Sequence, residues 1–307
     1  MTVFDTSYSS LEYQPVGPLA RLWPIIKMEF LQIFRQRKGL LIFIGCVAFV
    51  VVKALLLWAT LSPDSEAMAE GIKMLERMSP SLSPLRPEFY INHATDWGWL
   101  PFLFLTSLVS VRSISGDRAV NALEIYWTRG ISPWGYFVGK WMGSFLLLAA
   151  AFLAGPLVLW LYGVIAAADG AFWDRTVEFM PSVLAALTLH CLVMSFLAVG
   201  FSSMSSSPNI AMFLWLLMIG GSKTLGTILT TISAYQLRRM EVVFEPPWYK
   251  AICPYEGMIR IQEDMAGIVP GPSDFDQIWI AWAILGVYAL VILWNLRRLL
   301  SNTEAVA

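Results

Sequence analysis

Side chains that commonly perform catalysis are few and widely spaced in this sequence of 307 residues. Its two histidines are His93 and His190, which excludes a histidine-rich metal site or paired haem ligands built from one chain. A hydroxyl group activated by an imidazole can cleave a peptide bond, and His190 with Ser202, Ser203 and Ser205 offers those two groups. Small polar residues in such a run are more typical of a turn between helices. We therefore assign no catalytic residue and keep an intramembrane enzyme as an alternative hypothesis.

Two further chemical patterns fail on their spacing. Cys46, Cys191 and Cys253 are too far apart in the sequence to form a metal motif or a disulfide framework. Residues 221–224, Gly-Ser-Lys-Thr, and 139–141, Gly-Lys-Trp, lack the Gly-x-x-x-x-Gly-Lys-Ser/Thr spacing of a phosphate-binding loop. We predict no ATPase of the Walker type, no metal site and no cofactor in this chain.

The composition instead indicates an integral membrane protein. Hydrophobic residues make up 57% of the chain and charged residues 14%, and the mean hydropathy is +0.62. So little polar surface cannot cover a soluble globule of this length. Apolar runs reach the roughly 20 residues that a helix needs to cross about 30 Å of hydrocarbon, whereas a membrane β-barrel would show alternating segments of about ten residues. We predict an all-α membrane protein with six transmembrane helices, at 40–61, 97–111, 136–166, 181–201, 209–231 and 278–296.

The distribution of Lys and Arg orients these six helices. One set of connecting segments carries eleven Lys and Arg against six Asp and Glu, and the opposite set carries eight against sixteen. Because cytoplasmic loops are enriched in Lys and Arg, we expect a multi-pass protein of the plasma membrane with both termini cytoplasmic. The predicted organisation is a cytoplasmic N-terminal segment 1–39, a membrane domain 40–296 with external loops 62–96 and 232–277 and a cytoplasmic loop 112–135, and a cytoplasmic tail 297–307.

The N-terminal segment contains an amphipathic helix. Apolar residues recur at helical spacing from Leu22 to Phe34, and Lys27, Arg35 and Lys38 lie among the polar positions between and after them. Pro24 suits the first turn of such a helix, where its missing N–H costs nothing. We predict a helix that lies along the inner membrane interface. The alternative is a helix packed on a soluble partner or on the transmembrane helices themselves.

The cytoplasmic loop between the second and third spans is too long for a simple turn. Helices in bundles are commonly joined by 2–8 residues, whereas here about two dozen residues of mixed charge and helical composition intervene. Asp117 is a plausible N-cap, and Gly130 and Pro133 would end the helix and redirect the chain. We predict one short helix over 117–127.

This loop resembles the coupling loop of ABC-2 type transporter permeases. The family pattern is an acidic-basic pair, a Gly-Thr-Leu-Glu-like segment, Arg-Pro-Ile-Ser-Arg, and then Gly-Lys before the next span. Here these segments read Asp-Arg at 117–118, Asn-Ala-Leu-Glu at 121–124, Arg-Gly-Ile-Ser-Pro at 129–133 and Gly-Lys at 139–140. Departures from the pattern include Ala122 for Thr, Gly130 for Pro and Pro133 for Arg. The six spans and the amphipathic start extend the resemblance loosely to the whole chain.

The resemblance implies a permease subunit that forms a translocation path and couples it to ATP hydrolysis by a separate ABC ATPase subunit. That partner would bind ATP and Mg, and export is the direction that the family implies. One chain has six spans, so a second permease copy or a paralogue is expected beside the ATPase, with the lipid bilayer around them and no nucleic acid. The coupling residues implied are Asp117, Arg118, Leu123, Glu124, Ile125 and Tyr126.

Two lysines interrupt predicted spans. Lys53 and Lys223 each lie about 20 Å from the inner end of their helix at 1.5 Å per residue. Either their side chains extend to the outer interface, or they line a path for an anionic substrate.

The external loops are longer than ordinary connections between helices, so we expect ordered structure there that contacts an extracytoplasmic partner or covers the exit. A membrane scaffold without transport activity remains a further alternative, and the sequence does not identify a substrate.

Overall fold

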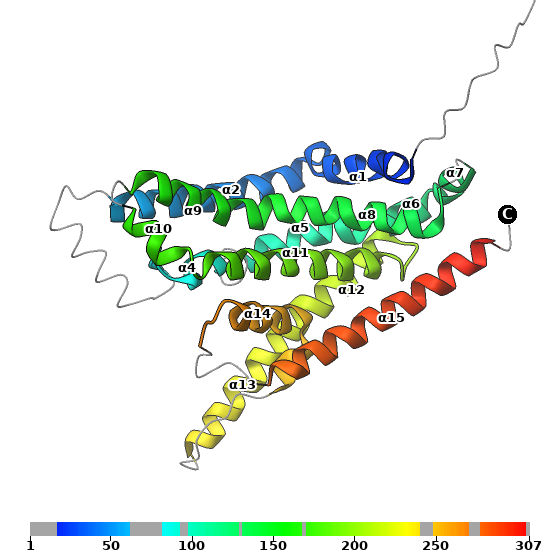
Figure 1. Cartoon of the computed structure of the whole chain (residues 1–307). Coiled ribbons are helices and arrows are strands. Elements are labelled where there is room, and N and C mark those ends of the chain that lie inside the picture. The colour runs from blue at the N-terminus through cyan, green and yellow to red at the C-terminus, as the bar shows by residue number, and fades with distance from the viewer. Residues whose placement is uncertain are drawn as a thin grey trace, which may run out of the picture.

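The computed structural model describes residues 17–61, 82–92, 98–128, 131–167, 170–239, 248–269 and 277–304. Helices account for nearly all of these residues, and no strand occurs among them, which confirms the predicted all-α class (Figure 1). In this described part of the chain, six runs of helix are long and apolar enough to cross a membrane, as predicted. Their bounds are Arg37–Leu61, Trp99–Ala119, Pro133–Ala166, Met180–Ser202, Pro208–Ile232 and Ile278–Leu299.

The elements follow one another as a chain of helices. In order they are α1 (Pro18–Arg35), α2 (Arg37–Leu61), α4 (Pro87–Ile91), α5 (Trp99–Leu108), η2 (Ser110–Arg112), α6 (Ser113–Ala119), α7 (Leu123–Thr128), α8 (Pro133–Leu148), η3 (Ala149–Leu153), α9 (Ala154–Ala166), α10 (Ala171–Thr176), α11 (Met180–Ser202), α12 (Pro208–Leu216), η4 (Leu217–Gly221), α13 (Ser222–Arg239), η5 (Trp248–Ile252), α14 (Pro254–Met265) and α15 (Ile278–Glu304).

Three of the six spans are composite. The second span joins α5, η2 and α6, so it extends to Ala119 and not to residue 111 as predicted. The third and fifth spans are interrupted by π-helical turns, η3 and η4. Pro156 follows η3 closely, and a proline ring disturbs the hydrogen bonding of the preceding turn of a helix.

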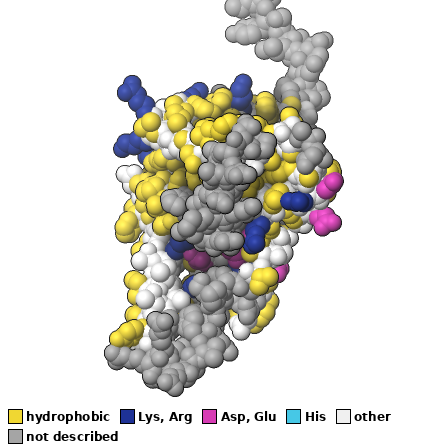
Figure 2. Space-filling model, turned by 90° about the vertical axis from the view of Figure 1, so that its left-hand side faces the viewer, with side chains coloured by type: hydrophobic (Ala, Val, Ile, Leu, Met, Phe, Trp, Pro, Cys, Tyr) yellow, Lys and Arg dark blue, Asp and Glu magenta, His cyan; other side chains and the backbone are white. Residues whose placement is uncertain are grey.

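Helix α11 lies at the centre of the bundle. It packs against α5, α8, α12, α14 and α15, and most of its residues are buried. In contrast, few of the residues of α2, the fifth span and α15 are buried. Hydrophobic side chains cover much of the described surface in Figure 2, with charged side chains in small groups. Such a surface suits a lipid environment or a further membrane subunit.

Helix α1 packs against α8. It begins at Pro18, so Pro24 lies inside the helix and the predicted first-turn position was wrong. Ile25 on α1 faces Gly139 of α8, where an added Cβ would come within 3.0 Å of Ile25. Because glycine has no side chain, the two helices can approach each other closely at Gly139. The prediction left open whether this helix packs on the spans, and the structure shows that it does.

The connections at the two ends of the bundle differ in size. Helix α1 and the end of α15 lie at the same end of the bundle as α7 (Figure 1). At the other end α4, η5 and α14 form the ordered structure expected in the long loops, and α14 packs against α11 and α15. Residues 62–81 and 240–247 of those loops fall outside the described residues.

Candidate functional site

The end of the second span and the residues that follow it form two short helices, α6 and α7, so the single helix predicted over 117–127 was wrong. Helix α6 ends at Ala119 and α7 begins at Leu123. Between them Asn121 has φ 53°, in the left-handed region that ends a helix. Asp117 consequently lies within α6 and is not an N-cap. We call α6 and α7 together the coupling segment.

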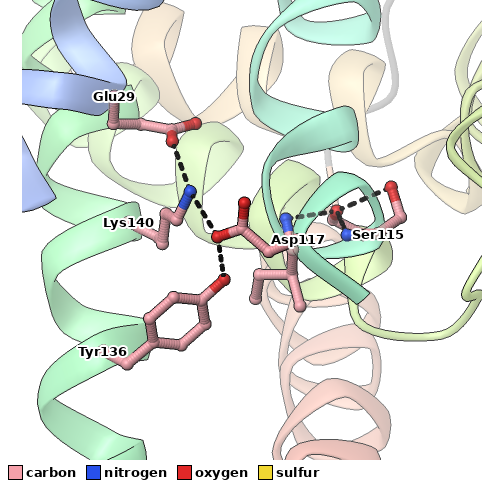
Figure 3. A network of polar contacts seen from close by, with 7 residues as sticks. Glu29, Ser115, Asp117, Tyr136 and Lys140 are labelled. Atoms are coloured by element: carbon pink, nitrogen blue, oxygen red, sulfur yellow. Dashed lines mark hydrogen bonds and ion pairs between the residues drawn. The ribbon is translucent and has the colours of Figure 1, made fainter. Parts of the chain in front are cut away.

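A buried group of charges joins α6 to α1 and α8 (Figure 3). Lys140 Nζ on α8 lies 3.1 Å from Glu29 Oε2 on α1 and 2.9 Å from Asp117 Oδ2 on α6. Tyr136, one turn earlier on α8, donates its hydroxyl group to Asp117 Oδ2 at 2.7 Å. We call Glu29, Asp117, Tyr136 and Lys140 the ion cluster. It connects three elements that are far apart in the sequence.

Removing any one charged residue of the ion cluster should destabilise the folded protein, because the charges that remain would be buried without a partner. Glu29 is 1% exposed and Lys140 is 7% exposed, so both charges have lost most of their water. Burial raises the pKa of the Glu29 carboxyl above its ordinary value, although the ammonium of Lys140 opposes that shift. Within the described residues, Glu29 Oε1 has no hydrogen-bond partner. Removing one partner from a buried ion pair leaves an uncompensated charge, which typically costs about 3–5 kcal/mol.

Hydrogen bonds fix the other side of α6 to the end of α11. The Ser202 hydroxyl oxygen accepts hydrogen bonds from the backbone N–H groups of Ile114 at 2.9 Å and Ser115 at 2.8 Å. These N–H groups belong to the first turn of α6, which has no partner within its own helix. Arg118 donates from Nη1 to the Ser203 carbonyl oxygen at 2.7 Å. Helix α6 is therefore held from both sides.

The end of α11 also contacts the last span, α15. Asn295 on α15 donates from Nδ2 to the Ser203 hydroxyl oxygen at 3.0 Å. Ser203 in turn donates to the Gly200 carbonyl oxygen at 2.6 Å. The serines at the end of α11 thus have structural partners in α6 and α15.

The sequence-predicted coupling residues divide into an inner and an outer set. Asp117 and Arg118 are engaged in the contacts described above. Leu123 and Tyr126 are partly buried, and the Tyr126 ring lies 4.9 Å from that of Tyr136. The outer set consists of Glu124 and Ile125, with Ile125 56% exposed. Val120, in the turn before α7, is 73% exposed and adds to this outer face.

The sequence reasoning missed three residues of this region: Glu29, Tyr136 and Ser202 in its role as an acceptor. A signal existed for Glu29. It occupies the middle of the series Ile25, Glu29, Ile33, whose spacing of four residues places all three on one helical face. All three are buried. A carboxylate on the apolar face of an amphipathic helix indicates a buried cationic partner.

The two lysines of the spans have separate environments. Lys53 is 4% exposed, donates to the Phe89 carbonyl oxygen of α4, and lies over the Phe49 and Phe89 rings. Lys223 forms an ion pair with Glu256 of α14. The structure therefore does not bring these two lysines together, and each contacts a different helix at the end of the bundle away from α7.

The residues considered for hydrolysis lie apart. His190 Nδ1 is 2.8 Å from Gln262 Oε1, between the rings of Phe102 and Tyr255. Ser202 is twelve residues further along the same helix, which corresponds to roughly 18 Å at 1.5 Å per residue. The three cysteines are buried and free, and the described residues contain no group of metal-ligating side chains. His93 falls outside the described residues.

The six spans, with α1 packed lengthwise along the third of them, define a multi-pass α-helical membrane protein. The family described as ABC-2 family transporter protein matches residues 23–246, nearly three quarters of the chain. The chain therefore belongs to this family, which confirms the resemblance noted in the sequence. It is an ABC transporter permease, and the family implies an ABC ATPase subunit as its partner. No curated protein matches the chain.

Proposed function

We propose that this permease forms the translocation path of an exporter, and that the coupling segment transmits movement from the ATPase subunit to the spans. The observation that carries the proposal is the exposed face of α7 and the preceding turn, formed by Val120, Glu124 and Ile125, on a segment whose other side is bonded to the bundle. An apolar centre beside a charge suits a protein partner.

The contacts of α6 support a transmission of force. The ion cluster connects α6 to α1 and α8, while Ser202 and Ser203 connect it to α11 and α15. A displacement of α6 would therefore act on several spans at once, because packed elements with buried hydrogen bonds move together. In this proposal Arg118 and Asp117 hold the segment, and Glu124 and Ile125 contact the ATPase.

The assembly follows from the same proposal. The ATPase subunit binds ATP and Mg, both chain termini are cytoplasmic, and a second permease copy or paralogue completes the path. Three spans in which few residues are buried, α2, the fifth span and α15, support an additional membrane subunit or lipid as their neighbour. The loops at the opposite end are available to an extracytoplasmic partner.

Charge reversal at α7 tests the coupling role. Glu124→Lys should reduce copurification of the ATPase subunit and transport-linked ATP hydrolysis, because reversing a charge within an interface can cost several kcal/mol. Glu178→Lys is the matched control, since Glu178 is an exposed acid at the other end of the bundle. Equal behaviour of the two variants, with both inserted in the membrane, would show that α7 is an ordinary loop helix.

A further inference from the structure

The ammonium group of Lys223 lies in an aromatic and acidic box. Lys223 Nζ is 5.1 Å from the centroid of the Trp99 ring and 5.3 Å from that of Tyr255. Glu256 Oε1 is 2.7 Å from the same nitrogen. The three groups come from α5 and α14, whereas the lysine comes from α13. We call Trp99, Tyr255 and Glu256 the ammonium box.

The chemistry of the box selects cations. The face of an aromatic ring is negative and attracts an ammonium group within about 6 Å, and aromatic cages with this geometry recognise quaternary ammonium ligands. Glu256 adds a full negative charge at hydrogen-bonding distance from Lys223. Because this carboxylate offsets the lysine charge, the site does not attract an anion, which argues against the anionic path considered from the sequence.

Tyr255 of the ammonium box and Lys223 differ in how tightly they are packed. Tyr255 is fully buried and packs against the rings of Phe102 and His190, so it stays in place. Lys223 is the second residue after the π-helical turn η4, and beyond it α13 is exposed on most of its faces. Such π turns often mark functional sites in helices. The lysine is thus carried by a lightly packed helix.

The ammonium box is also partly exposed at the surface of the protein. The side chains of Lys223 and Glu256 are 22% and 25% exposed, so an external group can approach the ion pair without unfolding the bundle. Trp99 begins the second span and is partly buried. An amphiphilic ligand could place its charged group here and its apolar part along the exposed apolar side chains of α13, such as Leu225 and Ile228.

The geometry points to a binding site for organic ammonium ions, in which Lys223 is a tethered occupant that a ligand displaces. The substrate class is then an amphiphilic amine or quaternary ammonium compound. Calling the ligand a substrate rests on the proposed transport function; its binding to the box does not.

The first experiment measures binding to the full chain with its ATPase partner in lipid nanodiscs, without ATP. The probe is benzyltrimethylammonium, and 2,2-dimethylpropylbenzene serves as its uncharged isostere. Lys223→Met removes the internal competitor and should tighten probe binding about tenfold, the scale of a desolvated cation–π contact. Adding Glu256→Gln or Trp99→Leu to that variant should abolish the gain. Lys250→Met, a lysine in η5 at the same end, should leave the affinity unchanged.

Lys223 and Glu256 form one ion pair, so opposite effects of their substitutions on probe binding distinguish a binding site from a purely structural ion pair. A structural ion pair predicts that Lys223→Met and Glu256→Gln both leave probe binding unaltered. Equal affinity for the probe and its uncharged isostere, or no gain in Lys223→Met, would overturn the proposal.

A second experiment uses the unaltered protein, so that it does not depend on the folding of a variant. Acylation of lysines by an amine-reactive ester is followed by mass spectrometry with increasing probe. Modification of Lys223 should rise severalfold as its amine leaves the box, while that of Lys250 stays constant. Unchanged modification at saturating probe would contradict displacement. Neither measurement uses ATP hydrolysis, so a failure here leaves the Glu124→Lys test intact, and the reverse also holds.

Discussion

Gly143 on α8 lies so close to Glu29 on α1 that a Cβ added to the glycine would come within 2.5 Å of the Glu29 Cβ. The same Cβ would be 2.8 Å from the Ile26 carbonyl oxygen, which belongs to the helix backbone and cannot rotate away. The position of α1 therefore depends on glycine at this point of α8. Because Glu29 also binds Lys140, the spacing of the two helices controls the ion cluster.

Gly143→Ala should displace α1 from α8 and destabilise the protein by about 1–3 kcal/mol, the usual cost of overpacking. Thermal unfolding in detergent and the rate of protease cleavage within α1 measure the two effects. Gly45→Ala on α2 is the control, since a Cβ there would meet nothing within 4 Å. Wild-type cleavage of α1 in Gly143→Ala would show that the contact is not required.

Lys140→Met should lower stability by about 3–5 kcal/mol, because Glu29 and Asp117 then lack their shared cation. The measurement is the midpoint of unfolding, and Lys27→Met, an exposed lysine on α1, is the matched control. Adding Glu29→Gln to Lys140→Met should recover part of the loss, since one buried charge disappears. If the double variant is no more stable than Lys140→Met, the coupling between the two charges is absent.

Glu29 should also make stability depend on pH. Its carboxyl group, which faces Lys140 and Asp117, has a folded-state pKa raised above the unfolded value by burial. The folded state therefore binds more protons than the unfolded state between those two values. As pH rises from the unfolded pKa through the folded one, the contribution of Glu29 to stability falls.

Unfolding temperatures of the wild type and of Glu29→Gln, measured from about pH 4.5 to 8, test this sign. The variant mimics the protonated group, so its stability relative to that of the wild type should rise as pH increases. A difference that is constant over this range, or that shrinks with rising pH, would show that the Glu29 carboxyl is not shifted upward.

Labelling with a membrane-impermeant thiol reagent tests the orientation that the distribution of Lys and Arg predicts. Asp264→Cys, at the exposed end of α14, should react in intact cells. Thr128→Cys, at the end of α7, should react only after the membrane is permeabilised, and both experiments need the native cysteines to remain silent, as their burial suggests. The opposite pattern would invert the topology and place α7 away from a cytoplasmic ATPase.

The number and positions of the spans were predictable because each contains a long apolar run, whose signal depends on composition alone. The ends of the spans were harder to predict from the sequence. The second span continues through Ser113 to Ala119, where polar residues are buried by α11 and not by lipid. A hydropathy pattern cannot distinguish a polar residue that a neighbouring helix satisfies from one in a loop.

The sequence predicted one short helix between the second and third apolar runs, and the structure has two, α6 and α7. Asp117 has the side chain of an N-cap, and in isolation that would favour a helix start. Its carboxylate instead binds Lys140 and Tyr136, which lie 23 and 19 positions away in the sequence. Contacts of this kind depend on how α6 and α8 pack, which no local propensity contains. The same holds for Lys53 and Lys223, which look alike in the sequence and whose partners described above are different.

The π-helical turn η4 determines the angular position of everything beyond it on the fifth span. A π turn accommodates one residue more than an α-helical turn of the same length, and one residue corresponds to about 100° of rotation at 3.6 residues per turn. If the residues of Leu217–Gly221 were wound as a regular α-helix, Lys223 would lie about that angle away from Trp99, Tyr255 and Glu256, while the helix kept its apolar length. Helical phase, set by one extra residue, therefore determines whether the ammonium box is filled.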